Sequence, residues 1–315
     1  MTESSPRLDA DSPLRGARIL VTGGAGFIGS HIVDCLAPHA DVRVLDDCST
    51  GDRDTVHEDA TLTVGSVTDR GLVDELTETV DHVFHLAAIP SVPATLDAPT
   101  RTLDVNTTAT AYLLERAADR DARLVFASSA AVYGRPSQLP IPESEPTTPR
   151  SPYGISKLAA DQYVRAYGDW DDCDAVALRF FNVYGPGQVA GVIPTFLARA
   201  RAGEPLVVHG DGNQTRDFVH VDDVVRALVA AATTTATGEA FNVGTGTATS
   251  VEELATLVSD LAPGSVPVVH DDPRPADVRE SCADTTVARD ELGFAAEVSL
   301  TDGLASLVGR TLAAD

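Results

Sequence analysis

A short apolar segment, a glycine-rich turn and an amphipathic segment follow one another near the start of the chain. Residues 18–22 read Arg-Ile-Leu-Val-Thr, residues 23–29 read Gly-Gly-Ala-Gly-Phe-Ile-Gly, and apolar residues then recur at helical spacing as far as Leu36. In this context the glycines let a dinucleotide's pyrophosphate approach the backbone N–H groups at the helix N-terminus. The pattern restricts the chain to an α/β fold that starts with a strand–turn–helix unit.

An acidic pair at the end of the second predicted strand specifies the nucleotide further. Residues 42–45 read Val-Arg-Val-Leu and lead into Asp46 and Asp47, about 20 residues beyond the glycine turn, where a ribose-binding acid is expected. A carboxylate there accepts hydrogen bonds from the adenosine ribose hydroxyls and repels a 2′-phosphate. We therefore predict NAD, in preference to NADP, as a cofactor bound by Gly23, Gly26, Phe27, Ile28, Gly29, Asp46 and Asp47.

Strand and helix patterns continue to alternate through the first half of the chain. The sequence predicts strands at 61–65, 82–87 and 123–127, with helices at 70–79 and 109–119. Such alternation produces a parallel sheet with helices on both faces, and ligands bind at the carboxyl ends of its strands. Small residues that leave room for a flat nicotinamide lie at the ends of two of these strands: Ala87, Ala88, Ser128 and Ser129. The two alanines are explained equally well as small residues that end a buried strand.

The chain contains a single lysine, Lys157, four residues after Tyr153. Residues i and i+4 lie on one face of a helix, so the two side chains can meet at one site. Arginine carries the same charge and is always protonated, whereas the pKa of a lysine shifts when its surroundings change. A lysine retained at this one position indicates chemistry that arginine cannot perform, and we prefer this interpretation to an exposed pair on a helix surface.

The charge and hydrophobic content exclude several classes of partner. A net charge of −24 repels nucleic acid and anionic membranes, so neither is expected as a partner. The acidic residues are dispersed and 43% of the chain is hydrophobic, which predicts a folded globular protein. Dispersed Asp and Glu with almost no lysine are typical of halophilic proteins, whose charge repulsion is screened by concentrated salt.

Cysteine spacing and hydropathy predict a cytoplasmic protein without a structural metal. The four cysteines are scattered and form no Cys-x-x-Cys sequence, which favours a reducing compartment and gives no zinc site or disulfide framework. No apolar run reaches the ~18 residues that span a membrane. The polar residues 1–15 have no signal-peptide core and are expected to form a disordered tail.

Four sequence blocks, in this order, resemble those of the extended short-chain dehydrogenase/reductases: residues 23–29, 85–88, 126–134 and 153–157. Within that family the chain is most similar to the NAD-dependent nucleotide-sugar epimerases, because the second half carries matching blocks at 179–186, 211–223, 241–244 and 274–277. The resemblance runs from about residue 18 to about residue 307. It implies a nucleotide sugar, of the UDP-hexose type, as the substrate.

The resemblance also implies roles for individual residues. Ser129, Tyr153 and Lys157 would be catalytic, and further cofactor contacts would come from Ser66, Val67, Leu86, Ala87, Ala88 and Asn106. Asn182, Arg216 and Arg274 would surround the nucleotide diphosphate, with Asp277 near the uridine ribose. Arginine forks suit this task because an acidic protein must offset two phosphate charges locally. Ser66 replaces an acid that usually holds the adenine amino group.

Ser281 follows Asp277 by four residues, at a position where the epimerases use a large tyrosine or a small residue to set the size of the sugar pocket. A serine lacks the aromatic ring of a tyrosine and leaves a larger pocket. Nucleotides of N-acetylhexosamines are therefore expected to be accepted as well as those of plain hexoses. The alternative is that Ser281 is only a small residue in a strand.

The implied reaction is NAD-dependent epimerisation at C4, as between UDP-glucose and UDP-galactose, through a transient 4-keto sugar. Tyrosine, with a pKa of about 10, is a poor base at neutral pH, but the Lys157 ammonium and the nicotinamide cation favour the phenolate. Tyr153 would then remove the proton of the 4-hydroxyl while Ser129 hydrogen-bonds the same oxygen. The keto sugar rotates in the site and is reduced on its other face, so no net oxidation occurs.

Three alternatives remain at this point. Nucleotide-sugar 4,6-dehydratases and decarboxylases resemble this chain but place a carboxylate beside the catalytic serine, where this chain has Ala130 and Ala131. A reductase of the same fold would release NAD(P)H. A non-catalytic nucleotide-binding protein would have no need for Ser129, Tyr153 and Lys157 together.

The predicted architecture is an α/β fold, in which a doubly wound parallel sheet (Rossmann fold) is joined to a smaller, interleaved mixed α/β lobe. We predict an NAD-binding domain at 16–180 and 216–247, and a nucleotide-sugar-binding lobe at 181–215 and 248–315. Family members commonly dimerise through helices equivalent to 109–119 and the helix of Tyr153, so a homodimer is expected.

Overall fold

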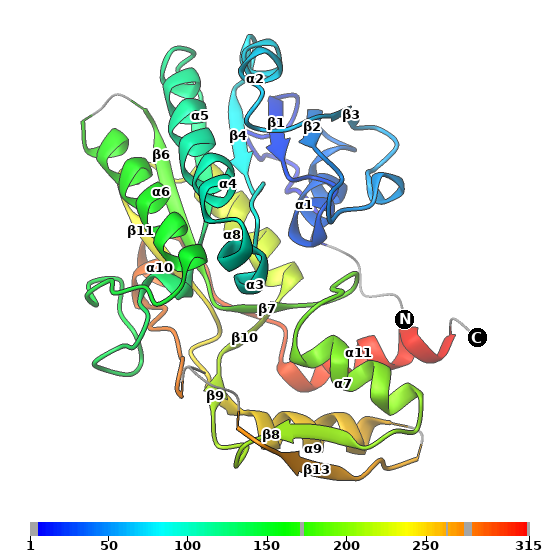
Figure 1. Ribbon diagram of the computed structural model, residues 1–315. Helices are drawn as coiled ribbons and strands as arrows, with labels where there is room; N and C mark the ends of the chain where they lie inside the picture. The colour runs from blue at the N-terminus through cyan, green and yellow to red at the C-terminus, as the bar shows by residue number, and fades with distance from the viewer. Residues whose placement is uncertain (1–5, 171–172, 263, 274–278, 314–315) are drawn as a thin grey trace.

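The computed structural model describes residues 6–170, 173–262, 264–273 and 279–313. Its main body is a seven-stranded sheet in the order β11-β6-β5-β4-β1-β2-β3 (Figure 1). Every pairing within this sheet is parallel. The strands are β1 (Arg18–Thr22), β2 (Asp41–Asp46), β3 (Thr61–Val64), β4 (His82–His85), β5 (Arg123–Ser129), β6 (Ala175–Phe180) and β11 (Ala240–Val243).

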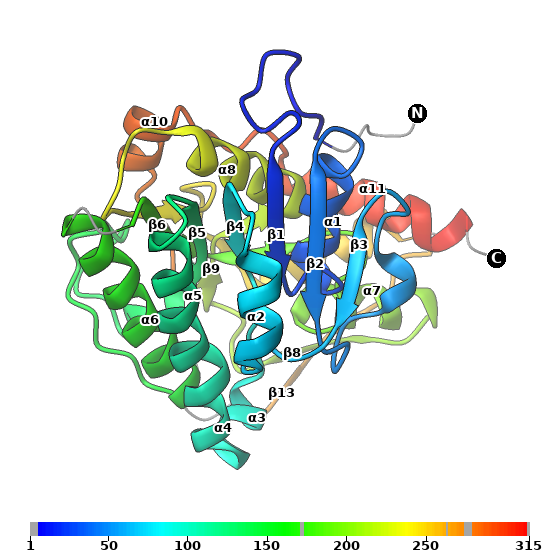
Figure 2. The ribbon, with the colours of Figure 1, turned by 90° about the horizontal axis from the view of Figure 1, so that it is seen from above.

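Helices cover both faces of the sheet (Figure 2). One face packs against α1 (Phe27–Leu36), α8 (Val221–Thr233) and α10 (Thr286–Leu292). The other face packs against α2 (Arg70–Thr77), α5 (Ala109–Ala118) and α6 (Pro152–Asp169). This doubly wound arrangement confirms the predicted fold class.

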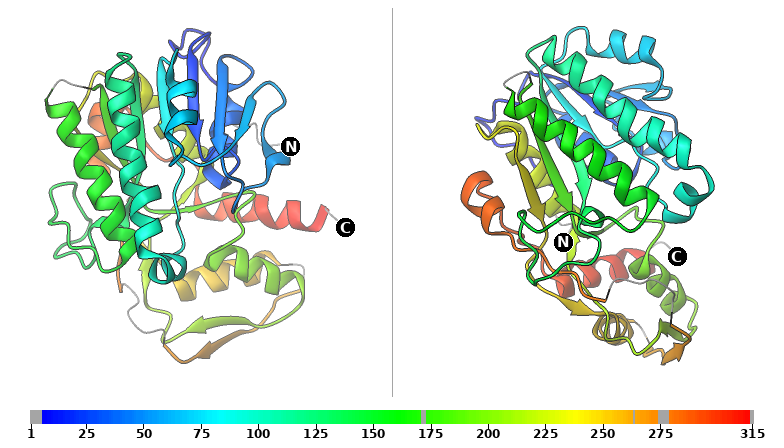
Figure 3. Two further views of the ribbon diagram at one scale, coloured as in Figure 1. Left: turned by 45° about the horizontal axis from the view of Figure 1, so that its top comes forward. Right: turned by 60° about the vertical axis from the view of Figure 1, so that its left-hand side comes forward.

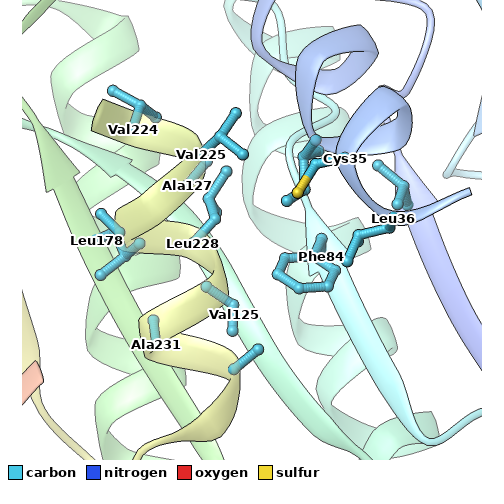
Figure 4. Packing of buried hydrophobic residues seen from close by; sticks show 14 of the residues in the cluster. Cys35, Leu36, Phe84, Val125, Ala127, Leu178, Val224, Val225, Leu228 and Ala231 are labelled. Carbon is cyan, nitrogen blue, oxygen red and sulfur yellow. The ribbon is translucent and has the colours of Figure 1, made fainter. Parts of the chain in front are cut away.

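Alternation along β5 shows why its residues suit a two-sided sheet. Leu124 and Phe126 belong to the cluster under α5 and α6, whereas Val125 and Ala127 belong to the cluster under α1 and α8. Successive side chains of a strand point to opposite faces, so a strand covered on both faces is apolar throughout. Figure 4 shows Val125 and Ala127 packed with Phe84 and the apolar face of α8.

A smaller lobe lies below the carboxyl edge of the sheet in Figures 1 and 3. Its own buried cluster includes Phe196, Leu206, Leu254 and Leu304. The lobe is built from α7 (Val192–Arg201), β8 (Leu206–His209), α9 (Val251–Leu261), β13 (Val268–Asp271) and α11 (Leu300–Ala313). Helix α9 begins with a capping box between Ser250 and Glu253.

Short elements join the two bodies and make the chain pass between them several times. Strand β7 (Asn182–Tyr184) pairs in parallel with β10 (Phe218–His220), and β9 (Thr215–Arg216) pairs antiparallel with β12 (Thr249–Ser250). The remaining elements are η1 (Arg53–Thr55), α3 (Val92–Asp97), α4 (Pro99–Leu103), the π-helix η2 (Asp104–Thr108) and η3 (Ala130–Val132).

Two predicted segment assignments differ from the structure. Residues 6–15 are not a disordered tail, because Leu8 and Leu14 are buried in the cluster beside α1 and α8. The span 248–315 does not belong wholly to the lobe, because Ala288 and Phe294, in and after α10, pack into the same cluster. In both cases isolated apolar side chains join the buried cluster that also contains α1 and α8.

Candidate active site

The glycine turn between β1 and α1 brings three chain segments unusually close. Gly23 has a φ of +75°, and a Cβ added to it would lie 2.6 Å from the Ala87 nitrogen at the end of β4. A Cβ on Gly29 would overlap the Gly23 carbonyl oxygen. On Gly26, by contrast, a Cβ would meet only the Gly23 oxygen, at 3.2 Å. Gly23 and Gly29 thus permit the turn, while Gly26 keeps the α1 N-terminus free of any side chain that would obstruct a phosphate.

Asp46 stands beside this turn at the carboxyl end of β2. Its Oδ2 accepts the Ala25 N–H at 2.9 Å and its Oδ1 accepts the Cys48 N–H at 2.8 Å. Each carboxylate oxygen has a second lone pair, so Asp46 can also accept from the ribose hydroxyls. Asp47 is exposed next to it and accepts the Ser49 N–H. A glycine cradle with an adjacent carboxylate fits NAD, and a 2′-phosphate would meet two negative charges here.

The other predicted cofactor residues lie at the ends of β3 and β4. Ser66 hydrogen-bonds the Thr68 side chain at 2.8 Å and accepts the Thr68 N–H, while Val67 is buried. Leu86, Ala87 and Ala88 are half-buried directly after β4. These positions lie at the carboxyl edge of the sheet. Their contacts with the adenine and nicotinamide ends of the cofactor stay predictions.

Asn106 links the loop after β4 to two helices. It is buried in η2, its Oδ1 accepts the Ile89 N–H at 2.8 Å, and its Nδ2 donates to the Ile89 carbonyl and to Ser156 Oγ. These bonds tie the loop after β4 to α6. A direct contact between Asn106 and the cofactor stays a prediction.

Helix α6 places Tyr153 and Lys157 one turn apart. The helix starts at Pro152 after the N-cap Ser151, whose Oγ accepts the Gly154 N–H at 3.1 Å. Lys157 is 3% exposed; its Nζ donates to the Ala127 carbonyl at 2.7 Å and lies 4.7 Å from the centre of the Phe126 ring. Burial lowers the pKa of this ammonium to about 7.

Ser129 ends β5 opposite this helix and hydrogen-bonds Tyr153. Burial raises the pKa of the Tyr153 phenol, and the hydrogen bond from Ser129 partly opposes that shift. Ser129 Oγ also accepts the Ala131 N–H at 3.2 Å, which fixes its orientation at the start of η3. The structure thus brings Ser129, Tyr153 and Lys157 together, as the sequence predicted.

A buried histidine lies beside this group, and the sequence reasoning gave it no role. His85 Nδ1 is 2.6 Å from Thr22 Oγ1, and its Nε2 is 2.9 Å from Thr110 Oγ1. Thr110 donates its proton to the Asn106 carbonyl, so it accepts from His85 Nε2–H, and Thr22 donates to Nδ1. Burial, together with the Lys157 charge, lowers the pKa of His85 to about 3, so the ring is neutral at pH 7.

The predicted substrate residues lie on the segments that join the sheet to the lobe. Asn182 is exposed on β7, and Arg216 is half-buried on β9 with its Nη1 2.8 Å from the Thr215 carbonyl. Ser281 donates its N–H to the same carbonyl at 3.2 Å, so it runs beside β9. Arg274 and Asp277 lie outside the described residues.

Asp217 holds this junction together, although no sequence signal indicated it. The carboxylate is fully buried and accepts four hydrogen bonds, from the Thr245 N–H and hydroxyl and from the N–H groups of Gly246 and Ala283. Burial raises its pKa, and the hydrogen bonds oppose this shift. Asp217 thereby fixes Arg216 and the segment after Ser281 relative to β11.

A dinucleotide cradle on a doubly wound parallel sheet, with serine, tyrosine and lysine gathered at its carboxyl edge, defines an enzyme of the short-chain dehydrogenase/reductase class. Residues 19–244 match the model of the NAD dependent epimerase/dehydratase family. The chain belongs to that family.

Known proteins similar to this chain cover nearly all of its length. It is 38% identical over 299 residues to a putative UDP-glucose 4-epimerase of Methanocaldococcus jannaschii, covering 92% of this chain and 97% of that one. The solved UDP-glucose 4-epimerase of Thermotoga maritima with UDP-glucose has a TM-score of 0.90 and 36% identity, covering 94% and 99%. The UDP-N-acetylglucosamine 4-epimerase of Methanobrevibacter ruminantium, in complex with UDP-N-acetylmuramic acid, has a TM-score of 0.91 and 32% identity, covering 96% and 100%.

Proposed function

We propose that this protein is an NAD-dependent nucleotide-sugar epimerase that inverts C4 of a UDP-hexose through a transient 4-keto sugar. The observation that carries the proposal is the meeting of Ser129, Tyr153 and Lys157 beside a cradle that fits NAD. The similarity to 4-epimerases over more than nine-tenths of the chain supports the same reaction.

Tyr153 is the proton acceptor and donor at the sugar 4-oxygen, and Ser129 hydrogen-bonds that same oxygen. Bound NAD supplies the reversible two-electron acceptor for this carbon. In the structure without it, burial raises the pKa of the Tyr153 phenol. A protonated Lys157 lies one turn away, and a nearby positive charge favours the phenolate. Ser129 holds the oxygen in place while its proton leaves and returns.

The residues around Ser129 favour epimerisation over elimination. A 4,6-dehydratase needs a base for the proton on C5 and an acid for the hydroxyl on C6, and the segment after Ser129 is η3, which begins with Ala130 and Ala131. Methyl side chains can neither donate nor accept a proton. Segment η3 therefore supplies no carboxylate that could remove water from a bound 4-keto sugar, and this favours reduction at C4.

Substrate binding is assigned to the junction between the sheet and the lobe. We propose that Asn182 and Arg216 hold the diphosphate, together with Arg274, and that Asp277 binds the uridine ribose. The support is that β7 and β9, which carry Asn182 and Arg216, both lie at this junction and are tied to Asp217 and its neighbours. Arginine suits a diphosphate because its planar fork donates two parallel hydrogen bonds.

The test is turnover of UDP-glucose, UDP-galactose and their N-acetyl analogues by the native protein and by Tyr153→Phe, with NAD present. The native protein is expected to convert each sugar to its C4 epimer without net NADH. Tyr153→Phe is expected to lose about a thousandfold in kcat, in the range of a missing general acid–base group. Accumulation of NADH, or of a dehydrated sugar, would replace this proposal with a reductase or a dehydratase.

We further propose that the protein is a homodimer that forms through α6 and the helices beside it. The support is apolar exposure: Ile155 and Tyr163 on α6 are 52% and 48% exposed, and Leu103 on α4 is 46% exposed. Ile155 and Tyr163 are two turns apart and therefore share a face. Analytical ultracentrifugation of the native protein and of Ile155→Arg tests this, since the charged variant should sediment as a monomer. A native monomer would contradict it.

We also propose a cytoplasmic location in a halophilic cell. The dispersed net charge of −24 supports the second part of this proposal. Within the described part of the chain, no helix is both long enough and apolar enough to cross a membrane.

A further inference from the structure

Three consecutive residues of β5 contact three residues of α6 that lie one turn apart. The side chain of Ser129 hydrogen-bonds Tyr153, and the carbonyl of Ala127 accepts from Lys157. Between them, Ser128 Oγ donates to Asp161 Oδ2 at 2.7 Å. Tyr153, Lys157 and Asp161 share one helix face because they are spaced by four residues. The first two contacts belong to the proposed chemistry, and the third has no role in it.

Asp161 is also held from the next strand. Arg179 donates from Nε to Asp161 Oδ2 at 3.0 Å and from Nη2 to Oδ1 at 2.9 Å. Ser128 and Arg179 are directly paired in the register of β5 and β6, so their side chains point to the same face of the sheet. One carboxylate on α6 therefore binds two neighbouring strands at the same level.

This ion pair is removed from water, and Arg179 also donates from Nη1. Asp161 and Arg179 are 0% and 1% exposed. Arg179 Nη1 donates to Tyr133 Oη and to the Glu143 carbonyl, both at 3.0 Å. Buried pairs of this kind add little stability compared with apolar residues of similar size, because desolvation offsets the attraction. Their directional hydrogen bonds nevertheless fix the rotation of α6 about its axis and its position along that axis relative to the sheet.

We propose that Ser128, Asp161 and Arg179 are positioning residues, which set α6 against the end of β5 so that Tyr153 and Ser129 reach the same substrate oxygen. The three residues act through α6 and touch no reacting atom. This inference rests on the proposed function, because it explains how that site keeps its geometry. A shift of about 1 Å at a reacting centre can cost on the order of a hundredfold in rate, so the setting of one helix is enough to control turnover.

Ser128→Ala is the variant that tests the proposal. It removes the bond between β5 and Asp161 but leaves both carboxylate oxygens bonded to Arg179, so no buried charge loses its partner. We expect kcat to fall about tenfold, equivalent to about 1.4 kcal/mol, with KM for the nucleotide sugar and the affinity for NAD nearly unchanged. The acid limb of the kcat–pH profile should move to higher pH, because a displaced Ser129 no longer lowers the pKa of Tyr153. Ser128→Thr restores the hydroxyl and should recover activity.

The matched control is Ser259→Ala in the lobe. Ser259 is also buried, and its Oγ donates to the Val266 carbonyl at 2.7 Å. Both variants should lose similar stability, but only Ser128→Ala should change kcat and the pH profile. If Ser128→Ala behaves like Ser259→Ala in all three measurements, the positioning role is wrong. A fall in kcat without a shifted pH limb and without rescue by threonine would also overturn it, since that pattern describes general loosening of the fold.

Hydrogen exchange separates failure of this inference from failure of the proposed function. Amides in the first half of α6 should exchange faster in Ser128→Ala than in Ser259→Ala, whether or not any nucleotide sugar is turned over. Equal exchange in the two variants would contradict the positioning role by itself. An inactive native protein with the expected difference in exchange would instead contradict the proposed function.

Discussion

Lys157 illustrates, at the scale of single residues, why one cation cannot replace another. Its ammonium is buried against the Ala127 carbonyl and the Phe126 ring, in a space that admits a compact group at the end of a flexible stem. Burial lowers its pKa to about 7, so its charge near neutral pH responds to its surroundings. A guanidinium is wider, always charged and planar, and it needs partners along its whole fork.

We therefore expect Lys157→Arg to be nearly as damaging as Lys157→Ala. Both variants should keep less than about a tenth of the native kcat/KM, a loss of more than about 1.4 kcal/mol. Epimerase assays at saturating NAD measure this, with the exposed substitution Arg120→Lys as a control for exchange of one cation for another. An arginine variant with more than a tenth of the native activity would show that charge alone is sufficient at this position.

Ser281 bears on which sugars are accepted. Its backbone runs beside β9, next to Arg216, and its side chain is half-buried. We expect Ser281→Tyr to depress turnover of UDP-N-acetylglucosamine at least tenfold more than turnover of UDP-glucose, since a ring would fill the space of the N-acetyl group and 1–3 kcal/mol is typical of such steric discrimination. Competition assays with both sugars measure the ratio, and Ser281→Ala is the control. Equal losses for both sugars would show that this side chain does not face the sugar.

At the scale of elements, helices and strands were predicted correctly where a periodic hydrophobic pattern extended over many residues and the turn residues were specific. The strands and helices from β1 to α2, and β4, α5 and β5, lie within a few residues of the predicted ranges. Tyr153 and Lys157 could be paired because residues four apart lie on one face of a helix. The role of Ser129 came from the resemblance to the epimerases, which the position of this residue at the carboxyl end of a predicted strand supports.

The missed features depend on contacts between distant segments. The short helices α3 and α4, which each have proline in the first turn, are too brief for a helical period to be visible. Leu8 and Leu14 are isolated apolar residues whose burial requires the surface between α1 and α8. The hydrogen bonds of Ser128 and Arg179 to Asp161 depend on the register that pairs these two residues in β5 and β6. No local sequence pattern encodes a register between strands so far apart in sequence.

The hydrogen-bonded chain through His85 joins β1, β4 and α5, and it predicts acid sensitivity. The pKa of His85 is lowered from 6.5 to about 3, so between these values the unfolded chain binds the proton that the folded one excludes. Stability from this residue is complete above pH 6.5 and is lost as the pH falls toward 3, with a slope of at most about 1.4 kcal/mol per pH unit.

Urea unfolding of the native protein and of His85→Gln between pH 4 and pH 7 measures this effect. The difference in unfolding free energy between the two proteins should shrink as the pH falls, because the glutamine binds no proton in either state. The surface variant His270→Gln controls for the loss of an exposed imidazole. A difference that stays constant across this range would show that His85 is not held neutral in the fold.

At the scale of the whole molecule, the net charge of −24 should make stability depend on salt. Repulsion between carboxylates acts over about 10 Å at 0.1 M salt and about 3 Å at 1 M. We expect the thermal midpoint to rise steadily as KCl is increased from 0.1 to 2 M. Sucrose at matched osmolality is the control, because it changes hydration without screening charge. A midpoint that does not respond to KCl beyond the sucrose effect would contradict the halophilic assignment.

The single lysine also gives this protein a built-in proteolytic reporter. A protease that cuts only after lysine has one target bond, which lies within α6 and divides the chain into two pieces of nearly equal length. Because Lys157 is buried, cleavage requires this helix to open, and the cleavage rate follows the population of the open form when reclosing is fast. Ligands that bind only the closed form slow the cut according to their affinity. The intensity of one gel band can therefore report how much of the protein has ligand bound, without any label.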